Sequence, residues 1–376
     1  MQSLRVAFVM EQTLGHVTHS QNLHSALAQR SDVVATWLPI SFDVAGGARY
    51  VPLVRSNWSI RASWRARCAL GSALVKAPHQ ALVFHTQVTS LFSVDFIQRY
   101  PTVVSLDATP INYDSVGAGY GHAAASGGFL DRRKYDLNRQ VFQTAASLVA
   151  WSDWAKTSLV HDYGVDPRRI AVLAPGANRA YFEIGERRLS KYPPQTRTPV
   201  RLLFVGGDFA RKGGPELIEA VRGLGDACEL HVVSNGAVGT TPPNVRVHRG
   251  VRPNSAELLS LFSQSDLFVL PTHADCLALV LMEATAAGLP VITTTVGALP
   301  EAILPGVSGM TVRPGDIGAL RTAIQALLAD SSLRARMGHA AHQLARRKFD
   351  AVRNNAALLD LVLESAERRL ADRRTA

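Results

Sequence analysis

Short apolar runs and amphipathic stretches alternate along most of the chain, and the pattern is clearest between residues 268 and 295. Residues 268–271 and 291–295 are predicted to form two buried strands. Between them, small and aliphatic residues recur at the spacing of one helical face: Leu277, Val280, Leu281, Ala284 and Gly288. Gly288 and Pro290 end this helix, because glycine accepts a left-handed conformation and proline cannot continue the turn. The stretch is therefore predicted to be a βαβ unit with parallel strands.

The same alternation predicts an α/β protein throughout. Further buried strands are expected at residues 4–10, 81–84, 103–106, 170–173, 200–205, 229–234 and 245–251. Helices are expected at residues 20–29, up to 163, from 215, at 317–347 and through 371. A chain of 376 residues is too long for one ordinary core, so we expect two domains. Residues 186–199, with two consecutive prolines and mixed charge, have the composition of a linker between them.

Composition indicates a globular protein with 47% hydrophobic and 19% charged residues. The net charge of +10 suggests an anionic partner such as phosphates, an acidic membrane surface or nucleic acid, although a generally basic surface is equally compatible. Three widely separated cysteines support neither a disulfide framework nor a zinc cluster, and a cytoplasmic location is expected. No stretch approaches the ~18 apolar residues of a membrane span, and the apolar run at 6–10 is too short for a signal peptide.

Residues 49–76 interleave arginines with large apolar side chains, namely Arg55, Arg61, Arg65 and Arg67 with Trp58, Ile60, Trp64 and Leu70. As a helix, this segment would be basic on one side and apolar on another. Such a helix suits an anionic membrane surface, and it would associate the protein with the inner face of the membrane. The alternative is a solvated helix whose tryptophans pack on the domain core.

Two acidic residues stand in the predicted βαβ unit, Asp275 at the start of the helix and Glu283 eight residues later. A helix would separate them by roughly 12 Å along its axis, about the reach of a sugar-diphosphate-ribose. Free N–H groups at a helix N-terminus also favour an anion between the two carboxylates. Two simpler readings stay open: Asp275 as a helix N-cap and Glu283 as an ordinary surface residue.

A glycine-rich turn follows the predicted strand at 200–205 and carries two cations, Arg211 and Lys212. Glycines such as Gly206 and Gly207 admit a close approach to the backbone, and the cations neutralise charge, so the turn is predicted to hold phosphate groups. It is not a Gly-x-Gly-x-x-Gly turn, which disfavours a nicotinamide oxidoreductase.

Candidate residues in the N-terminal half follow predicted strands. Gly15 and His16 lie in the loop after the first strand, His85 ends the strand at 81–84, and Asp107 follows the strand at 103–106. The carboxyl ends of strands are where open α/β sheets bind ligands. A structural histidine and a loop-capping aspartate are the alternatives for His85 and Asp107. The pair His16-x-x-His19 lacks a third ligand at suitable spacing, so no metal site is predicted.

The segment from Asp275 to Glu283, followed by Ala-Thr-Ala-Ala-Gly-Leu-Pro-Val-Ile, resembles the Glu-x7-Glu motif of family 4 retaining glycosyltransferases. The resemblance implies the GT-B fold, in which two Rossmann-like domains face each other across a cleft and a C-terminal helix crosses back. Residues 1–190 are then the acceptor-side domain and residues 198–350 the nucleotide-sugar-binding domain. Residues 351–376 are the helix that packs back on the first domain.

The resemblance also assigns roles. Lys212 would hold the donor diphosphate with Gly206, Gly207 and Arg211, Glu283 would bind the ribose, and Asp275 would contact the sugar. The residues implied to contact the donor nucleotide sugar are Val251, Cys276, Leu277, Ala278 and Leu279. His85 would lie near the donor sugar. Gly15, His16 and Asp107 would face the acceptor. The chain departs from the family where Asp275 replaces a glutamate, where Cys276-Leu277-Ala278 replaces Gly-Phe-Gly, and where Gly207 replaces an arginine.

The implied function is transfer of a sugar from a nucleotide-diphosphate sugar to a hydroxyl of a saccharide or lipid-linked acceptor. Configuration would be retained, and the setting would be polysaccharide or glycolipid biosynthesis. No Asp-x-Asp motif is present, so no metal or other cofactor is expected, and nucleic acid is not expected as a partner. A non-catalytic nucleotide-sugar or polyanion-binding protein on the same fold is the alternative, favoured by Asp275 and Ala278.

Overall fold

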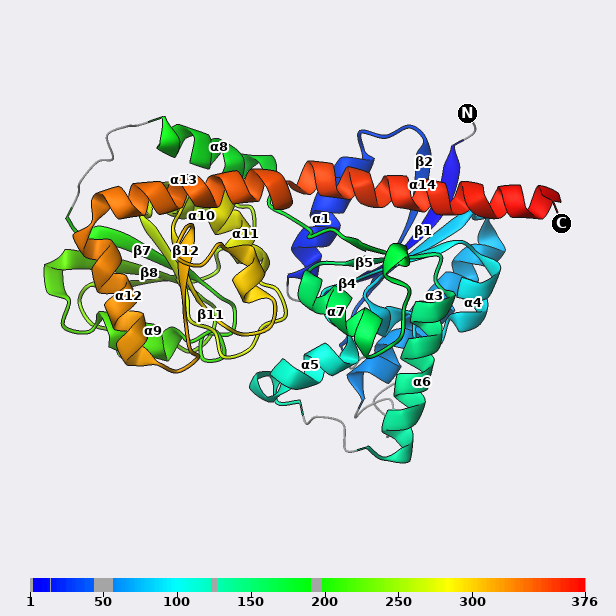
Figure 1. Ribbon diagram of the computed structural model, residues 1–376, viewed down its shortest axis with the longest axis horizontal. Coiled ribbons are helices and arrows are strands. Elements are labelled where there is room, and N and C mark those ends of the chain that lie inside the picture. Colours follow the sequence, from blue (N-terminus) through cyan, green and yellow to red (C-terminus); the bar gives the residue numbers. More distant parts are fainter. Residues whose placement is uncertain (1–2, 14, 44–56, 123–126, 191–197, 376) are drawn as a thin grey trace. The chain divides into compact units, whose positions relative to one another are not determined.

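The computed structural model describes residues 3–13, 15–43, 57–122, 127–190 and 198–375 (Figure 1). The chain divides into two compact units. Unit 1 consists of Met1–Tyr113, Ala125–Ala174 and Val352–Ala376, and unit 2 consists of Asp114–Ala124 and Pro175–Ala351. None of the described helices is long and apolar enough to cross a bilayer.

Unit 1 is built on a sheet of six strands in the order β2-β1-β3-β4-β5-β6, with every neighbouring pair parallel. The strands are β1 (Leu4–Glu11), β2 (Val33–Ile40), β3 (Ala81–His85), β4 (Thr102–Leu106), β5 (Ser147–Ala150) and β6 (Ile170–Val172). The central strands are apolar and buried along their whole length, as expected of a parallel sheet covered on both faces.

Helices cover both faces of this sheet (Figure 1). They are α1 (His16–Leu27), α3 (Trp58–Lys76), α4 (Val94–Arg99), α6 (Phe129–Thr144), α7 (Asp153–His161) and α14 (Ala351–Thr375). Helix α5 (Pro110–Val116) begins in unit 1 and contains the first residues of the unit 2 segment Asp114–Ala124. Although α14 is distant in sequence, its apolar face is part of the unit 1 core. Leu359 and Val362 lie buried in one cluster with Val6 and Phe8 of β1.

Unit 2 repeats the plan with a parallel sheet in the order β12-β11-β10-β7-β8-β9. Its strands are β7 (Val200–Val205), β8 (Cys228–Val233), β9 (Val245–His248), β10 (Leu267–Leu270), β11 (Val291–Thr294) and β12 (Gly309–Val312). Its helices are α8 (Arg179–Leu189), α9 (Gly214–Val221), α10 (Ala256–Gln264), α11 (Leu279–Ala286), α12 (Ile317–Ala329) and α13 (Ser331–Lys348).

The segments that enter and leave unit 2 are hydrogen-bonded to each other. The backbone N–H of Ala177 donates to Phe349 O at 2.8 Å, and the N–H of Ala351 donates to Ala177 O at 3.1 Å. Gly176 has φ +76°, and a Cβ there would lie 2.5 Å from Phe349 O, so only glycine fits this approach. The crossings at Ala174–Pro175 and Ala351–Val352 therefore lie beside one paired element.

The predicted βαβ unit is confirmed as β10, α11 and β11, with Phe268 opposite Val291 in a parallel register. Two boundaries differ from expectation. Helix α1 starts at His16 and not at residue 20. Helix α8, which Asn178 caps by accepting from the N–H of Ala180 at 3.0 Å, belongs to unit 2. The expected domain end at residue 190 is therefore wrong, because the chain passes into unit 2 after Ala174. Residues 191–197, which make up half of the expected linker, lie outside the described residues.

Each sheet has one point where the strand order reverses. In unit 1 the chain runs from β1 outward to β2 and then returns to place β3 on the other side of β1. In unit 2 it runs from β7 through β8 to β9 and then returns to place β10 on the other side of β7. Loops at the carboxyl ends of the two strands at such a point separate and leave a crevice, which is the usual ligand site of open α/β sheets.

The basic face expected between residues 49 and 76 is turned toward the protein in α3. Arg61 is buried, and its Nε and Nη2 donate to Phe42 O at 3.0 and 2.8 Å. Arg65 donates to Ser41 O at 2.8 Å, and Arg67 pairs with a carboxylate of α4. This corrects the expectation that these arginines are available to a membrane surface, while Arg55 lies outside the described residues.

The alternative interpretation of α3 is also only partly right. Trp58 is partly buried and stacks on Phe42 with ring centroids 5.4 Å apart. Trp64, however, remains 57% exposed and so does not pack into the core.

Candidate functional site

Lys212 and Asp275 form the centre of the candidate group in unit 2. Lys212 lies in the loop after β7 and Asp275 in the loop after β10, so both stand at the reversal point of this sheet. The Lys212 ammonium and the Asp275 carboxylate make an ion pair, and their side chains are only 14% and 10% exposed. A paired cation and anion at this crevice can hold an anionic group and a hydroxyl group side by side.

Glycines allow the loops around this pair to approach closely. A Cβ at Gly206 would lie 3.0 Å from Cγ of Lys212, so the turn packs against the lysine stem. Gly297 has φ +52°, and a Cβ there would lie 2.3 Å from Asp275 O. Ala298 adds a hydrogen bond of 2.8 Å from its N–H to Cys276 O. The loop after β11 thereby fixes the backbone that carries Asp275. At Gly207 a Cβ would meet no atom within 4 Å, which leaves its backbone open on that side.

Arg211 is directed into the protein and not toward an open surface. Its side chain is 7% exposed; Nη1 donates to Ala274 O at 2.7 Å and Nε to Asp208 Oδ2 at 3.2 Å. These bonds tie the turn after β7 to the loop after β10. Arg211 therefore supports the position of Asp275, and its direct phosphate contact stays a prediction.

Glu283 is a buried residue in the middle of α11, so its interpretation as an ordinary surface residue is wrong. Burial raises its pKa to about 7, and the hydroxyl of Tyr181 on α8 opposes this rise. The Tyr181 hydroxyl has no hydrogen-bond partner of normal geometry in the described structure. Glu283 thus changes charge near neutral pH, which few carboxylates do.

Asp275 does not cap α11, because the helix starts at Leu279 with Ala278 in the N-cap position and no side-chain cap. The 12 Å spacing expected for a helix between the two carboxylates therefore does not apply. Cys276, Leu277 and Ala278 are buried and connect Asp275 to the helix. Val251 lies at the same edge of the sheet, in the loop after β9.

A second group lies at the reversal point of the unit 1 sheet. His85 ends β3, His16 opens α1 after β1, and Asp107 follows β4. His16 Nδ1 lies 3.0 Å from His85 Nε2, and His16 Nε2 lies 3.9 Å from Asp107 Oδ2. The structure thus brings three of the predicted N-terminal residues together. Gly15 precedes α1 with an ordinary helical φ of −66°, so its backbone does not require glycine.

Sequence reasoning missed two residues of this group, Glu11 and Trp151. Glu11 is buried at the end of β1; it accepts from Thr86 at 2.6 Å and lies 3.7 Å from His16 Nε2. Trp151 follows β5 and stacks on His85 with ring centroids 5.4 Å apart. Both stand where a buried parallel strand ends, and that position is the signal that would have found them.

Two of the clustered histidines are held neutral. Burial, reinforced by the neighbouring histidines, lowers the pKa of His85 well below its usual value and that of His19 to about 3. His85 Nδ1 and both ring nitrogens of His19 have no hydrogen-bond partner in the described structure. The described residues contain no group of three or more His, Cys, Asp or Glu side chains arranged to hold a metal ion.

The neighbours of His16 select its tautomer. A proton on Nδ1 would leave a bare Nε2 facing the carboxylates of Glu11 and Asp107, and would force the His85 proton onto a buried nitrogen without an acceptor. The opposite arrangement avoids both costs. His85 Nε2–H donates to His16 Nδ1, and His16 Nε2–H points toward the carboxylates. Both N–H groups therefore point the same way: that of His85 toward His16, and that of His16 toward Glu11 and Asp107.

Comparison with known proteins gives a consistent picture. Residues 199–330 match the family model described as glycosyl transferases group 1. Glycogen synthase from Mycobacterium tuberculosis is 28% identical over 240 residues, covering 61% of this chain and 56% of that protein. D-inositol 3-phosphate glycosyltransferase from Corynebacterium diphtheriae is 30% identical over 256 residues, covering 59% of each. The chain thus spans somewhat more than half the length of these relatives.

A solved structure extends the likeness to both units. The Anabaena protein HepE, in complex with UDP and glucose, has a TM-score of 0.67 and 16% identity, covering 95% of this chain and 98% of that one. At this identity the likeness shows the fold alone. The fold is GT-B, with two Rossmann-like domains, as predicted.

Proposed function

We propose that this protein is a retaining glycosyltransferase of family 4. It transfers a sugar from a nucleotide-diphosphate sugar to a hydroxyl of a saccharide or lipid-linked acceptor. The observation that carries the proposal is the largely buried Lys212–Asp275 pair at the reversal point of the unit 2 sheet. The match of residues 199–330 to a glycosyl transferase family supports it, because this range contains the pair.

Lys212 has the chemistry to stabilise the departing nucleoside diphosphate, because an ammonium in a largely buried loop neutralises charge that develops as the glycosidic bond breaks. Asp275 accepts a hydrogen bond from a sugar hydroxyl once Lys212 turns to the diphosphate. Glu283 accepts the ribose hydroxyls in its ionised form. The Anabaena protein of the same fold was solved with UDP, which supports a nucleotide ligand for this chain.

Retention follows in this proposal from attack on the same face of the sugar that the diphosphate leaves. The acceptor oxygen forms the new bond to the anomeric carbon as the old carbon–oxygen bond breaks, and the leaving phosphate oxygen takes the acceptor's proton. No metal is needed, because Lys212 and backbone N–H groups supply the positive charge. His85 would lie near the donor sugar, and His16 and Asp107 would orient the acceptor.

The proposal is tested by incubating the protein with UDP-, GDP- and ADP-sugars and measuring release of the nucleoside diphosphate. Asp275→Asn should leave nucleoside diphosphate affinity within about threefold while lowering transfer at least about tenfold. Glu283→Gln should weaken binding of the free nucleotide and of the donor together. Glu257→Gln, an exposed carboxylate at the start of α10, is the matched control and should change neither. Absence of turnover and binding with every donor would refute the proposal.

A further inference from the structure

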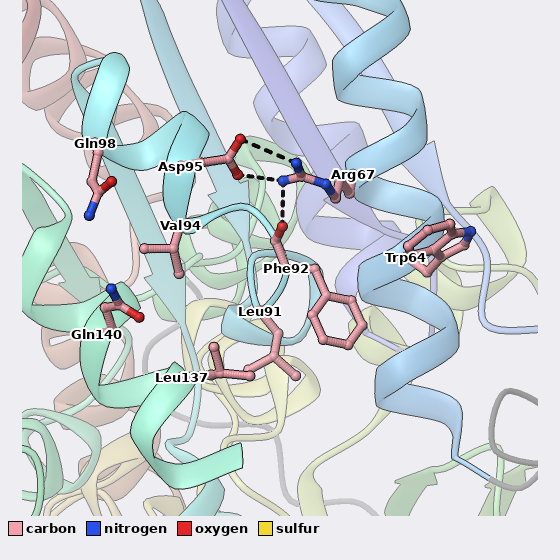
Figure 2. Close-up of a pocket in the computed structure, with 9 residues that line it drawn as sticks. All are labelled: Trp64, Arg67, Leu91, Phe92, Val94, Asp95, Gln98, Leu137 and Gln140. Carbon is pink, nitrogen blue, oxygen red and sulfur yellow. Dashed lines mark hydrogen bonds and ion pairs between the residues drawn. The ribbon is translucent and has the colours of Figure 1, made fainter. Parts of the chain in front are cut away.

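An open pocket with a volume of about 580 Å³ lies in unit 1 among α3, α4 and α6 (Figure 2). Its lining consists of Trp64, Arg67, Leu91, Phe92, Val94, Asp95, Gln98, Leu137 and Gln140. None of these residues belongs to either candidate group at the sheet ends. The pocket is therefore a separate feature that the proposed transfer reaction leaves unexplained.

The charged groups of this pocket satisfy one another. Arg67 donates through Nη1 to Phe92 O at 2.6 Å and is paired with both oxygens of Asp95. Arg99 also donates to Asp95, through Nη2 to Oδ2 at 2.7 Å. Because Asp95 occupies the Arg67 guanidinium, a phosphate or carboxylate ligand would have to break this pair. A cationic ligand would likewise meet a carboxylate that two arginines already neutralise.

The unused hydrogen-bonding capacity belongs to two neutral amides. Gln98 of α4 and Gln140 of α6 are exposed, and neither side chain makes a hydrogen bond within the described part of the chain. Figure 2 shows both amides on one side of the pocket and the Trp64 ring on the other, with Leu91 and Phe92 between them. Each amide offers both donors and an acceptor, while the 57% exposed indole offers a flat apolar face.

We propose that this pocket binds a neutral saccharide. A sugar ring presents C–H groups on one face, which suit the Trp64 ring, and hydroxyls at its edge, which both donate and accept as the two amides require. An aliphatic chain over these two exposed amides would displace their water without replacing its hydrogen bonds, and an anion would compete with Asp95 for Arg67. The volume is within the range of small-molecule sites and accommodates more than one sugar ring.

The test is a titration of the full chain with neutral tetrasaccharides, namely maltotetraose, cellotetraose, mannotetraose and galactotetraose, followed by ligand-observed NMR. We expect at least one to bind with a Kd in the millimolar range or below. Trp64→Ala should weaken that binding about tenfold, and the Gln98→Ala and Gln140→Ala variants about threefold to tenfold each. All three side chains are exposed, so these variants should fold normally.

Two matched controls locate the effect. Phe129→Ala removes a 73% exposed aromatic residue of α6 that does not line the pocket, and Gln325→Ala removes an exposed amide of α12; both should bind as the wild type does. Trp64→Ala should release nucleoside diphosphate from donor sugars at the wild-type rate, so this result stays separate from the test of the proposed function. Binding that is unchanged in all three pocket variants, or no binding by any tetrasaccharide, would overturn the proposal.

Discussion

The Lys212–Asp275 pair should couple strongly in a double-mutant cycle. We consider Lys212→Met, Asp275→Asn and the variant that carries both. Opposite charges about 3 Å apart attract by about 5 kcal/mol at an effective dielectric constant of about 20, and desolvation offsets much of this. Because the two side chains keep only 14% and 10% exposure, removing one leaves the other poorly solvated. Each single variant should therefore lose about 3 kcal/mol of unfolding free energy.

The double variant leaves neither charge unpaired, so it should lose no more than about 2 kcal/mol. Independent losses of about 3 kcal/mol each would add to about 6 kcal/mol, so the coupling energy should be at least about 4 kcal/mol. Urea unfolding followed by far-UV circular dichroism reports both units. Tryptophan fluorescence reports unit 1 alone, because Trp37, Trp58, Trp64, Trp151 and Trp154 all lie there. The circular dichroism transition of unit 2 should move while the fluorescence transition stays.

Activity gives a second measurement on the same variants. Lys212→Met should lower kcat/KM for donor turnover by about 30-fold or more, equivalent to 2 kcal/mol of transition-state stabilisation. Lys348→Met, an exposed lysine of the same unit, is the control and should retain activity and fold. Additive losses of stability within about 0.5 kcal/mol, or a shift of the fluorescence transition only, would refute the reasoning about the pair.

Four further predictions follow from other contacts. The pKa of Glu283 is raised from 4.5 to about 7, so between these pH values the folded state keeps a proton that the unfolded chain releases. The free energy of unfolding should therefore fall by about 3 kcal/mol as pH rises from 4.5 to 7. Glu283→Gln should remove this pH dependence, which urea titrations measure. Nucleoside diphosphate affinity, measured calorimetrically, should instead rise between pH 6 and 8 in the wild type and stay flat in that variant. Arg61→Ala should cost about 2–4 kcal/mol of unfolding free energy, because it removes a buried side chain and both of its hydrogen bonds to the part-buried carbonyl of Phe42. Glu11→Gln should change the ¹⁵N chemical shifts of His16 because one of the two carboxylates facing it is lost, and unchanged shifts would contradict the tautomer assignment. Turnover should persist in EDTA, and a strict Mg²⁺ or Mn²⁺ requirement would count against the metal-free mechanism.

Sequence patterns predicted the elements whose cores are continuous in the chain. The βαβ unit around α11 was predictable because its apolar runs and helical spacing lie within one short stretch. Strand β12 was not predicted, since Gly309–Val312 is short and half of it is only partly buried. Helix α8 was interpreted in part as linker because its charged residues resemble those of a solvated segment, although its buried Tyr181 ties it to unit 2.

The candidate groups were harder to predict because their members meet only through sheet order. Lys212 and Asp275 are 63 residues apart, and their pairing depends on β10 lying beside β7. The same holds for Glu11, which joins His16 and His85 because β1 and β3 are neighbours. Burial is equally invisible in the sequence: Arg211 looks like a phosphate ligand until its carbonyl partner Ala274 is known.

The membership of α14 in unit 1 sets an order for folding during synthesis. Most of unit 2, Pro175–Ala351, is inserted between Ala174 and Val352, and its entry and exit segments are hydrogen-bonded to each other. A ribosome therefore completes all of unit 2 before it delivers Leu359 and Val362, which the unit 1 core needs. Until then, the face of the unit 1 sheet that includes Val6 and Phe8 stays partly uncovered. The segments of unit 1 that precede Pro175 must wait for α14, and the inserted unit can fold first.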